Sequence, residues 1–350
     1  MPLAPIAQRL LRDRIGGAQG KNKDVSLEKL LGRIPPSRLA DHPLIRKAPQ
    51  QRLSHAHGQS MPDWIDLRWG TLKRFPDGVA FPTSTEELCN ILRFAQEAGA
   101  VVIPYGGGTS VVGHLSVPQD PRLMLSLSLC RLNRLLCLNE TSRLATFEAG
   151  VAGPDVEAQL RGHGFTLGHY PQSFEYSTLG GWVATRSSGQ QSGHYGRIED
   201  LFAGGVVFTP RGPLTCPPYP ASAAGPDLRH LILGSEGRLG IVHKAIVRIR
   251  PLPEKDEVYA IFFPSWDHGV EAVRSVAGED IPFSMIRLSN PEETSTQLAL
   301  AGKERAIDLL RHYLKFRKIS GGVMCLMGFT GSRSHVTGAR RRARTVIRRH

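Results

Sequence analysis

Glycine and hydroxyl residues gather in three short segments of this chain, a combination that suits the binding of a phosphate-rich ligand. The segments are PYGGGTSVVG at 104–113, PQSFEYSTLGGWVATRSSG at 171–189 and GSEGRLGIV at 234–242. Glycine lets the backbone approach a ligand closely, and backbone amides with Ser and Thr hydroxyls can donate to phosphate oxygens. One such segment alone is equally well explained as a structural turn, but three in one chain favour a shared ligand site.

The best-known nucleotide fingerprints do not describe these segments. The segment 104–113 is not GxGxxG, because Ser110 and Val111 do not fit that pattern, and no GK[ST] follows it. The dinucleotide-binding Rossmann motif and the phosphate-binding P-loop are therefore both disfavoured.

The elements that must position these segments alternate between strands and helices. A helix is expected over 85–98, where Thr83 with Glu86 and Ser84 with Glu87 form two overlapping capping boxes. Hydrophobic patterning predicts strands at 79–82, 101–104, 123–127, 134–138, 144–148, 231–233 and 241–249, and a further helix over 154–163.

The last hundred residues repeat this alternation and predict a small sheet covered by helices. Strands are expected at 258–263, 283–288 and 323–329, and helices over 265–277, 301–316 and the Arg-rich end. Residues 1–74 are rich in Pro and basic side chains and are expected to form an extended lead-in with a short helix over 26–31. The predicted domains are thus 1–74, 75–253 and 254–350.

The net charge of +13 is confined to the two ends of the chain. Residues 1–50 carry +6 and residues 339–350 carry +6, whereas residues 51–338 carry only +1. A near-neutral body, and an Arg-rich end without an aromatic platform, argue against nucleic acid as a partner. The Arg-rich end is read either as a solvated helix of the last domain or as a basic amphipathic helix at a membrane surface.

Five cysteines without a CxxC pair predict reduced thiols in a cytoplasmic protein, with peripheral membrane contact as an alternative location. No metal is predicted, because the pair His55 and His57 has no carboxylate at ligand spacing. Among the thirteen histidines, His194 has the strongest case for a function, since it adjoins the second glycine segment; His169 is a weaker candidate.

The three segments, in this order, resemble the PCMH-type FAD-binding domain of the vanillyl-alcohol oxidase superfamily. Within it the chain is most similar to the alkyldihydroxyacetonephosphate synthase branch, over roughly residues 60–330. The strings that carry the resemblance are PYGGGTSVVG at 104–113, QSFEYSTLGGWVATRSSG at 172–189, YGRIEDL at 195–201, GSEGRLGIV at 234–242 and IRLSN at 286–290. The implied fold is α+β, with a PCMH-type FAD-binding domain of two α/β subdomains followed by a partial α/β cap domain for substrate.

The resemblance also implies a cofactor, FAD, and the residues that would contact it. The first segment would bind the diphosphate, the second the flavin side and the third the adenine side and the isoalloxazine edge. The implied FAD-binding residues are Pro104, Tyr105, Gly106, Gly107, Gly108, Thr109, Ser110, Gln172, Ser173, Phe174, Glu175, Tyr176, Ser177, Thr178, Thr185, Arg186, Ser187, Ser188, Glu236, Gly237, Arg238, Leu239, Gly240, Ile241 and Val242. Non-covalent FAD is expected, because the 104–113 loop offers no clear anchor.

The branch exchanges an acyl for an alkyl group on dihydroxyacetone phosphate, which forms an ether lipid without net oxidation. Arg287 matches its substrate-phosphate arginine, a role that suits a guanidinium because it can clamp phosphate with two hydrogen bonds. Without the resemblance, Arg287 would be read as a surface arginine at the end of a strand.

Two features depart from the branch. Arg238 stands where a small residue such as Thr is expected, and the branch's proton-donor Tyr and consecutive histidines have no counterpart before His350. The chain therefore resembles a member shortened at its C-terminus, whose own activity is in doubt and whose catalytic residues are unknown.

Other functions remain open from the sequence. One alternative is an FAD-linked glycolate or D-lactate dehydrogenase, and one of another class is a basic lipid-surface or nucleic-acid binder without flavin. The expected partner is a small phosphate or hydroxyacid substrate, of which a lipid is one form, and a homodimer is compatible with the sequence.

Overall fold

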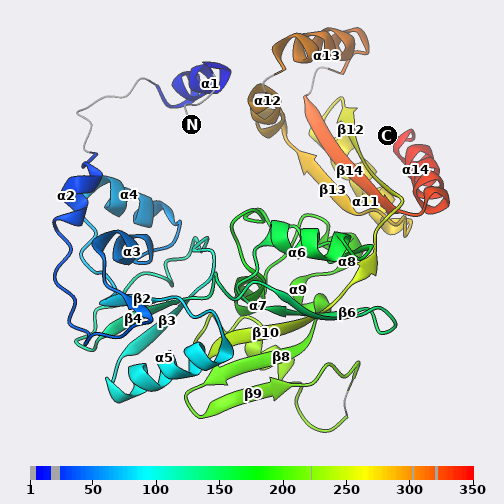
Figure 1. Cartoon of the computed structure of the whole chain (residues 1–350). Helices are drawn as coiled ribbons and strands as arrows, with labels where there is room; N and C mark the ends of the chain where they lie inside the picture. Colours follow the sequence, from blue (N-terminus) through cyan, green and yellow to red (C-terminus); the bar gives the residue numbers. More distant parts are fainter. Residues whose placement is uncertain (1–4, 17–23, 222, 302, 320–321) are drawn as a thin grey trace. The chain divides into compact units, whose positions relative to one another are not determined.

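The computed structural model describes residues 5–16, 24–221, 223–301, 303–319 and 322–350 (Figure 1). Its contacts divide the chain into two units. The cofactor unit, as we call it, comprises Asn22–Gln190 and Tyr195–Pro251, and the cap unit contains Gln191–His194, Leu252–His350 and the N-terminal helix α1 (Pro5–Ile15).

The first part of the cofactor unit is a four-stranded sheet in the order β1-β2-β4-β3. Strands β2, β4 and β3 are parallel, and β1 adds to the edge in the antiparallel sense. The strands are β1 (Ile45–Arg46), β2 (Gly78–Ala80), β3 (Val101–Tyr105) and β4 (Met124–Ser128), and the helices are α2 (Leu27–Leu31), α3 (Pro49–Ser54), α4 (Met61–Trp69) and α5 (Thr85–Glu97).

The second part of the cofactor unit is a five-stranded antiparallel sheet in the order β5-β6-β10-β8-β9. Phe147 and Phe202 are fully buried in one core with Val156 and Val183, so helices α6 and α7 cover this sheet. The elements are β5 (Leu135–Asn139), β6 (Leu144–Glu148), α6 (Gly153–Arg161), β7 (Phe165–Thr166), α7 (Leu179–Thr185), α9 (Ile198–Leu201), β8 (Phe202–Thr209), β9 (Gly212–Cys216), α10 (Arg229–Ile232), β10 (Ile241–Arg248) and β11 (Arg250–Pro251).

The short helix predicted over 26–31 is confirmed as α2, but the rest of the predicted extended lead-in is wrong as far as α4. The chain from α2 to α4 forms three short helices, and Ile45 and Arg46 pair with Ala80 and Val79 of β2. The prolines begin helices here instead of only breaking them, since Pro49 lies in the first turn of α3. This part of the chain therefore belongs to the cofactor unit.

The helix predicted over 85–98 is confirmed as α5, but its cap differs in detail. Ser84 is the N-cap and accepts a hydrogen bond from the Glu87 backbone amide at 3.1 Å. In a capping box the Glu87 carboxylate would accept from the Ser84 amide. Here it accepts instead from the amide and hydroxyl of Thr83, one residue earlier.

The strand predicted at 231–233 is also wrong, because this stretch contains the end of helix α10. The Leu233 amide donates to the Arg229 carbonyl at 2.9 Å, which closes a helical turn, and Leu231 is 55% exposed. Three adjacent apolar residues are compatible with either element, so the pattern alone could not separate them.

The cap unit is built on a three-stranded antiparallel sheet in the order β12-β14-β13. Val323 and Cys325 of the central strand share a core with Val276 and Ala339, so helices α11 and α14 cover one face of the sheet. The elements are α8 (Ser192–Tyr195, of which Tyr195 belongs to the cofactor unit), β12 (Lys255–Phe263), α11 (Trp266–Gly278), β13 (Met285–Ser289), α12 (Pro291–Leu300), α13 (Glu304–Phe316), β14 (Val323–Gly331) and α14 (Arg333–Ile347).

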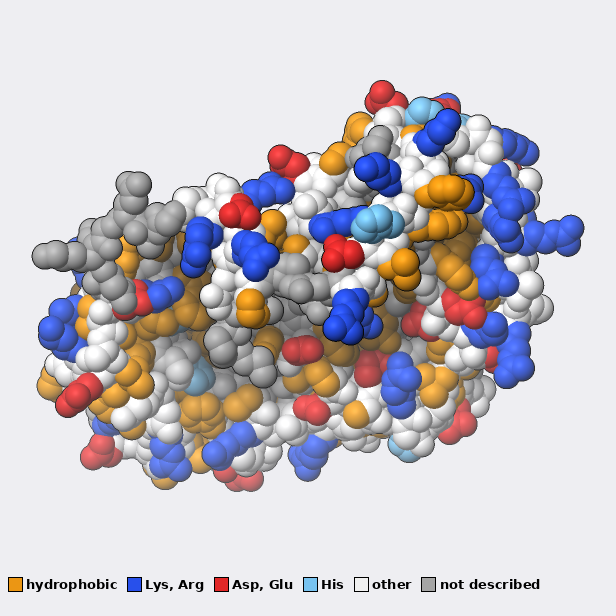
Figure 2. All heavy atoms as spheres, turned by 90° about the horizontal axis from the view of Figure 1, so that it is seen from above, with side chains coloured by type: hydrophobic (Ala, Val, Ile, Leu, Met, Phe, Trp, Pro, Cys, Tyr) orange, Lys and Arg blue, Asp and Glu red, His pale blue; other side chains and the backbone are white. Residues whose placement is uncertain are grey.

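The Arg-rich helix α14 is a packed helix of the cap unit and does not present an apolar face for other partners. Ala339, Ala343 and Val346 on its apolar side are at most 4% exposed. Its arginines reach partners in the same unit, since Arg340 donates to the Tyr259 hydroxyl at 2.6 Å and Arg342 to the Glu279 carbonyl at 2.6 Å. Lys and Arg side chains gather at the right-hand end of the face seen in Figure 2.

The α+β architecture expected from the sequence is confirmed in both units. Among the described residues, no helix has the length and apolar character that crossing a lipid bilayer would require.

We predict that Asp77 is a principal polar anchor of the four-stranded sheet. Its buried carboxylate accepts from Arg38 at 2.7 and 2.8 Å and from the Met124 amide at 2.8 Å. Burial opposes ionisation, but these hydrogen bonds outweigh it and lower the pKa of Asp77. Asp77→Ala should reduce the free energy of unfolding by about 2–3 kcal/mol in denaturant titrations, because buried donors lose their acceptor.

The matched control is Asp41→Ala, which removes a fully exposed carboxylate paired with Lys47 and should leave stability nearly unchanged. Because the pKa of Asp77 is lowered on folding, the ionised carboxylate adds to the free energy of unfolding at pH values above the ordinary aspartate pKa of about 4. This added stability is lost as the pH falls through the lowered pKa. Equal effects of the two variants would contradict the anchoring role.

Candidate cofactor site

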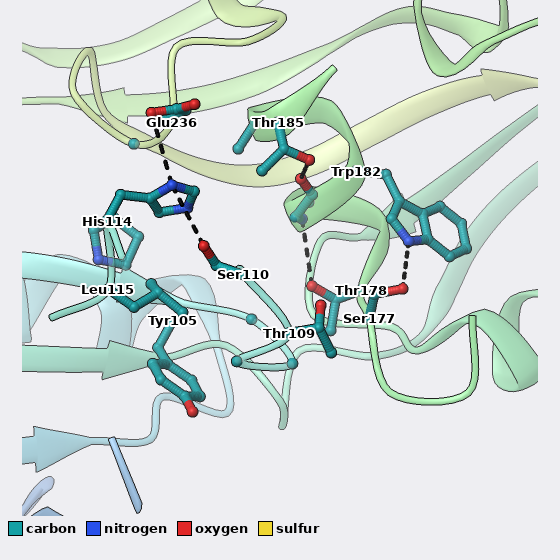
Figure 3. A pocket seen from close by; sticks show the side chains of 18 of the residues that line it. Tyr105, Thr109, Ser110, His114, Leu115, Ser177, Thr178, Trp182, Thr185 and Glu236 are labelled. Carbon is teal, nitrogen blue, oxygen red and sulfur yellow. Dashed lines mark hydrogen bonds and ion pairs between the residues drawn. The ribbon is translucent and has the colours of Figure 1, made fainter. Parts of the chain in front are cut away.

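The three glycine segments meet around one cavity of about 690 Å³ within the cofactor unit (Figure 3). The first segment enters it from the end of β3, the second from the residues around α7, and the third from the turn before β10. The sequence-predicted residues that line the cavity are Pro104, Tyr105, Gly106, Gly107, Gly108, Thr109, Ser110, Ser173, Ser177, Thr178, Thr185, Ser187, Glu236, Gly237, Arg238, Gly240 and Val242.

The first and second segments approach so closely that a side chain would not fit between them. A Cβ added to Gly107 would lie 1.7 Å from the Tyr176 carbonyl oxygen, and one added to Gly106 would lie 2.4 Å from the Thr178 hydroxyl. Backbone therefore packs on backbone at this edge of the cavity, which explains the glycines physically.

The third segment closes against the first. Gly237 has a φ of +79°, in the left-handed region that favours glycine, and its Cβ position lies 3.1 Å from the Pro104 ring. Glu236, just before it, is held in the same region with a φ of +52°. This turn places Arg238 at the cavity wall, where none of the described residues pairs with its guanidinium.

The cavity is rich in hydrogen-bond donors that the fold does not use. The backbone amides of residues 106–110 donate no hydrogen bond to another described residue. Hydroxyl groups of Thr109, Ser110, Thr178 and Thr185 lie around the same space. The Thr185 hydroxyl already donates to the Gly181 carbonyl at 2.9 Å. The unused amides, with hydroxyl groups beside them in a partly enclosed cavity, still suit a diphosphate group, so these residues fit a dinucleotide cofactor such as FAD.

Some residues predicted from the sequence lie outside this cavity. Arg186 is the clearest, because it is the C-cap of α7 with a φ of +52° and its guanidinium contacts Glu199 at 2.7 Å and His230 at 2.9 Å. Ile241 lines a neighbouring hollow that shares Pro104 and Arg238 with the cavity. The remaining predicted residues absent from the lining are Gln172, Phe174, Glu175, Tyr176, Ser188 and Leu239; their cofactor contacts stay predictions.

The predicted phosphate ligand Arg287 lies in the cap unit, at the middle of β13 and not at its end. It is opposite Leu326 of β14, and its exposed guanidinium pairs with Glu293 of α12. A second charged group therefore orients this arginine before any ligand arrives.

Comparison with known proteins agrees with this geometry. Residues 76–216 match the FAD binding domain family, and residues 252–349 match the C-terminal domain family of FAD linked oxidases. The chain belongs to the PCMH-type FAD-binding flavoproteins. FAD is its cofactor. The cavity between the three glycine segments is the candidate site for it, and we call this cavity the FAD site.

Among its relatives, the alkyldihydroxyacetonephosphate synthase of Dictyostelium discoideum is 35% identical over 293 residues, which are 81% of this chain and 48% of that protein. A solved structure of an alkyldihydroxyacetonephosphate synthase superposes with a TM-score of 0.89 at 29% identity, covering 99% of this chain and 66% of the other. The mitochondrial D-lactate dehydrogenase of Arabidopsis thaliana is more distant, at 31% identity over 217 residues, 61% of this chain and 37% of that protein. The chain spans about half the length of the curated synthases it matches.

A buried polar network that sequence reasoning missed holds the second segment of the FAD site. Trp182 Nε1 donates to the Ser177 hydroxyl at 2.7 Å, and that hydroxyl donates to the Ser173 carbonyl at 2.8 Å. Trp182 lies inside the second glycine segment, so its position was a signal, but nothing in the sequence said that its ring would be buried and would donate to Ser177 (Figure 3).

His169 is the most perturbed titratable group beside the FAD site. Its side chain is 1% exposed, lies edge-on to Trp182 and contacts the Ser187 hydroxyl at 2.7 Å through Nε2. Burial lowers the pKa of His169 from 6.5 to about 4, so the imidazole is neutral at physiological pH. Ser187 itself lines the cavity, so His169 orients a cavity hydroxyl from behind. His194, the stronger sequence candidate, belongs to the cap unit.

His114, which follows the first segment, and Glu236 of the third segment face each other across the FAD site. His114 Nδ1 lies 3.8 Å from a Glu236 carboxylate oxygen and 3.5 Å from the Ser110 hydroxyl, as Figure 3 shows. The pair connects two walls that belong to different sheets, because His114 follows β3 and Glu236 precedes β10.

We predict that Gly107→Val abolishes retention of FAD. The added carbons would overlap the Tyr176 carbonyl and force apart the two segments that line the site. The measurement is flavin absorbance remaining after gel filtration, with circular dichroism to establish that the variant is folded. The control Gly162→Ala has only ordinary contacts, the nearest at 3.5 Å, and should keep its flavin. A folded Gly107→Val protein with full flavin would refute the diphosphate assignment.

We also predict an acid sensitivity caused by His169. Because its pKa is lowered on folding, the unfolded chain binds more protons between about pH 4 and pH 6.5, and stability falls as the pH decreases through that window. Denaturant unfolding should show about 2 kcal/mol less stability at pH ~5 than at pH ~7 from this residue. His169→Gln should remove that part of the loss, whereas the exposed His163→Gln should leave it unchanged.

Proposed function

We propose that this chain is the FAD-binding and cap-forming part of an enzyme of the alkyldihydroxyacetonephosphate synthase type. Such an enzyme replaces the acyl group of acyl-dihydroxyacetonephosphate by a fatty alcohol and so forms an ether lipid. The observation that carries the proposal is that both units, and not the FAD-binding domain alone, match the solved synthase. Bound FAD would supply its reactive flavin ring to the exchange. The chain's own residues would hold the cofactor and the substrate.

Arg287 is the residue that supports a phosphate-bearing substrate. Its guanidinium is exposed on β13 and pairs with one carboxylate among the described residues, that of Glu293, which leaves donors for a second acceptor. The pairing lowers the pKa of Glu293 through the hydrogen bond from Arg287, so the carboxylate stays ionised and keeps the guanidinium oriented. A preoriented guanidinium can bind a phosphate with two parallel hydrogen bonds.

A second candidate is an FAD-linked 2-hydroxyacid dehydrogenase, which the similarity to the Arabidopsis D-lactate dehydrogenase supports. The two reactions differ in their electron balance. A dehydrogenase transfers two electrons from the hydroxyacid to the flavin, whereas the acyl-to-alkyl exchange leaves the substrate and flavin at the same oxidation level at its end.

The experiment uses the 350-residue chain loaded with FAD. One arm supplies acyl-dihydroxyacetonephosphate with an isotope-labelled fatty alcohol and searches for the labelled ether lipid and the released fatty acid by mass spectrometry. The other arm supplies D-lactate or glycolate without oxygen and follows loss of the oxidised flavin spectrum. Ether formation without flavin reduction supports the synthase, and flavin reduction by a hydroxyacid without exchange supports the dehydrogenase instead.

We predict that Arg287→Gln weakens binding of dihydroxyacetone phosphate to the FAD-loaded chain by about tenfold to a hundredfold in calorimetry, because a charge-assisted double hydrogen bond is lost. Arg274→Gln is the matched control, since Arg274 is an exposed arginine of the same unit that pairs with Glu271 in the same way. Unchanged binding by Arg287→Gln, or an equal loss in both variants, would contradict the role of Arg287.

A further inference from the structure

One buried hydrogen bond connects the core of the cofactor unit to a hydroxyl of the FAD site. His169 Nε2 lies 2.7 Å from the Ser187 hydroxyl oxygen. The histidine is 1% exposed and does not line the cavity, whereas Ser187 does. His169 can therefore act on a bound ligand only through the hydroxyl of Ser187.

The fold fixes both partners of this hydrogen bond. The Glu157 carboxylate accepts from the Gly168 amide at 3.0 Å, which holds the chain just before His169. The ring of His169 lies edge-on to the ring of Trp182, with their centroids 5.0 Å apart. The Ser187 amide donates to the Trp182 carbonyl at 3.0 Å. Imidazole and hydroxyl are thus both held against Trp182, and their separation is set before any cofactor binds.

The second ring nitrogen of His169 determines which group donates. Nδ1 is buried and has no hydrogen-bond partner among the described residues. Burial lowers the pKa of His169 to about 4, so at physiological pH the ring carries one proton, on either Nδ1 or Nε2. A proton on Nδ1 would leave a buried N–H group without an acceptor, which folded proteins avoid more strictly than an unpaired acceptor. The proton therefore sits on Nε2, which donates to the Ser187 oxygen.

This assignment leaves the hydroxyl proton of Ser187 available to the cavity. Among the described residues, His169 is the one hydrogen-bond partner of the Ser187 side chain. A hydroxyl that accepts from an imidazole still has its own proton to donate. The flavin ring of FAD offers acceptors for it, namely carbonyl oxygens and unprotonated ring nitrogens.

We propose that His169 is a positioning residue that directs the Ser187 hydroxyl to donate to the flavin ring of bound FAD and so raises the reduction potential of the flavin. Two-electron reduction of FAD with uptake of one proton leaves one negative charge on the ring. A hydrogen bond donated to the ring is stronger when the ring is negative, so the bond favours the reduced form. The inference rests on the predicted flavin-side contact of Ser187 and not on the proposed reaction.

The test is the midpoint potential of FAD bound to the 350-residue chain, measured by titration with dithionite in the presence of indicator dyes. Dithionite supplies the two electrons and the solvent supplies the proton. His169→Leu should lower the affinity for reduced relative to oxidised FAD by about tenfold, which for a two-electron couple is a fall of about 30 mV. Ser187→Ala should cause a fall of the same size. The double variant should fall no further, because both residues act through one hydrogen bond.

A conservative variant and a matched control separate positioning from stability. The side-chain amide of His169→Gln can still donate to Ser187, so this variant should keep most of the wild-type potential. His243 is the matched control, because it is also 1% exposed, contacts the Thr85 hydroxyl at 2.9 Å through Nε2 and has no partner for Nδ1 among the described residues. Neither His243 nor Thr85 lines the FAD site, so His243→Leu should lose a buried imidazole without a change in potential. Circular dichroism and flavin content establish that each variant is folded and loaded.

Three results would overturn the proposal. The first is a wild-type potential in Ser187→Ala, a variant that removes a single oxygen atom and so decides the question even where His169→Leu does not fold. The second is a fall in Ser187→Ala that is absent from His169→Leu, which would assign the effect to the serine alone. The third is an equal fall in His243→Leu, which would trace the effect to a general loosening of the core. None of these measurements requires ether formation, so failure of the proposed reaction is visible separately.

Discussion

The contact between Gly107 and the Tyr176 carbonyl is the constraint on which the FAD site depends. Two backbone segments that are distant in the sequence touch there without side chains between them. The contact places the loop after β3 against the residues before α7, so the unused amides of one segment and the hydroxyls of the other face the same space. Trp182 and Ser177 then hold the second segment in that position from within the core.

The FAD site offers few cations to an anionic cofactor. Arg238 and His114 are the basic side chains that line it, and His114 faces Glu236. Backbone amides and hydroxyls would therefore supply most of the attraction for a diphosphate. Such binding relies on short, oriented hydrogen bonds and is less sensitive to salt than binding by a cluster of lysines. This arrangement agrees with the nearly neutral charge of residues 51–338. The chain's excess positive charge lies at its two ends and is not needed to line the FAD site.

Helices α13 and α14 show how burial separates two segments that look alike as sequences. Both carry apolar residues at helical spacing among Lys and Arg. The sheet of the cap unit offers a face to Ala343 and Val346, whose row is narrow enough to be covered completely. On α13 only Ile307 and Leu314 are buried, and Leu309, Tyr313 and Phe316 remain exposed. The sequence pattern indicates that both helices are amphipathic. Only the tertiary packing determines which apolar face is buried when the chain folds.

The sequence by itself determined the α+β class, most elements and the three segments of the FAD site, because glycine and hydroxyl residues have strong local preferences and the strands are short apolar runs. It could not place Arg186, since a side chain at a helix end turns toward whichever partner the fold provides, here Glu199. Its pattern predicted a strand where the structure has the end of α10, and it did not indicate the contacts of His114 and Trp182. These features depend on neighbours far along the chain. The preference for helix or strand depends mainly on adjacent residues. The direction of a side chain and the exposure of a helix face depend on long-range contacts, which only the tertiary structure shows.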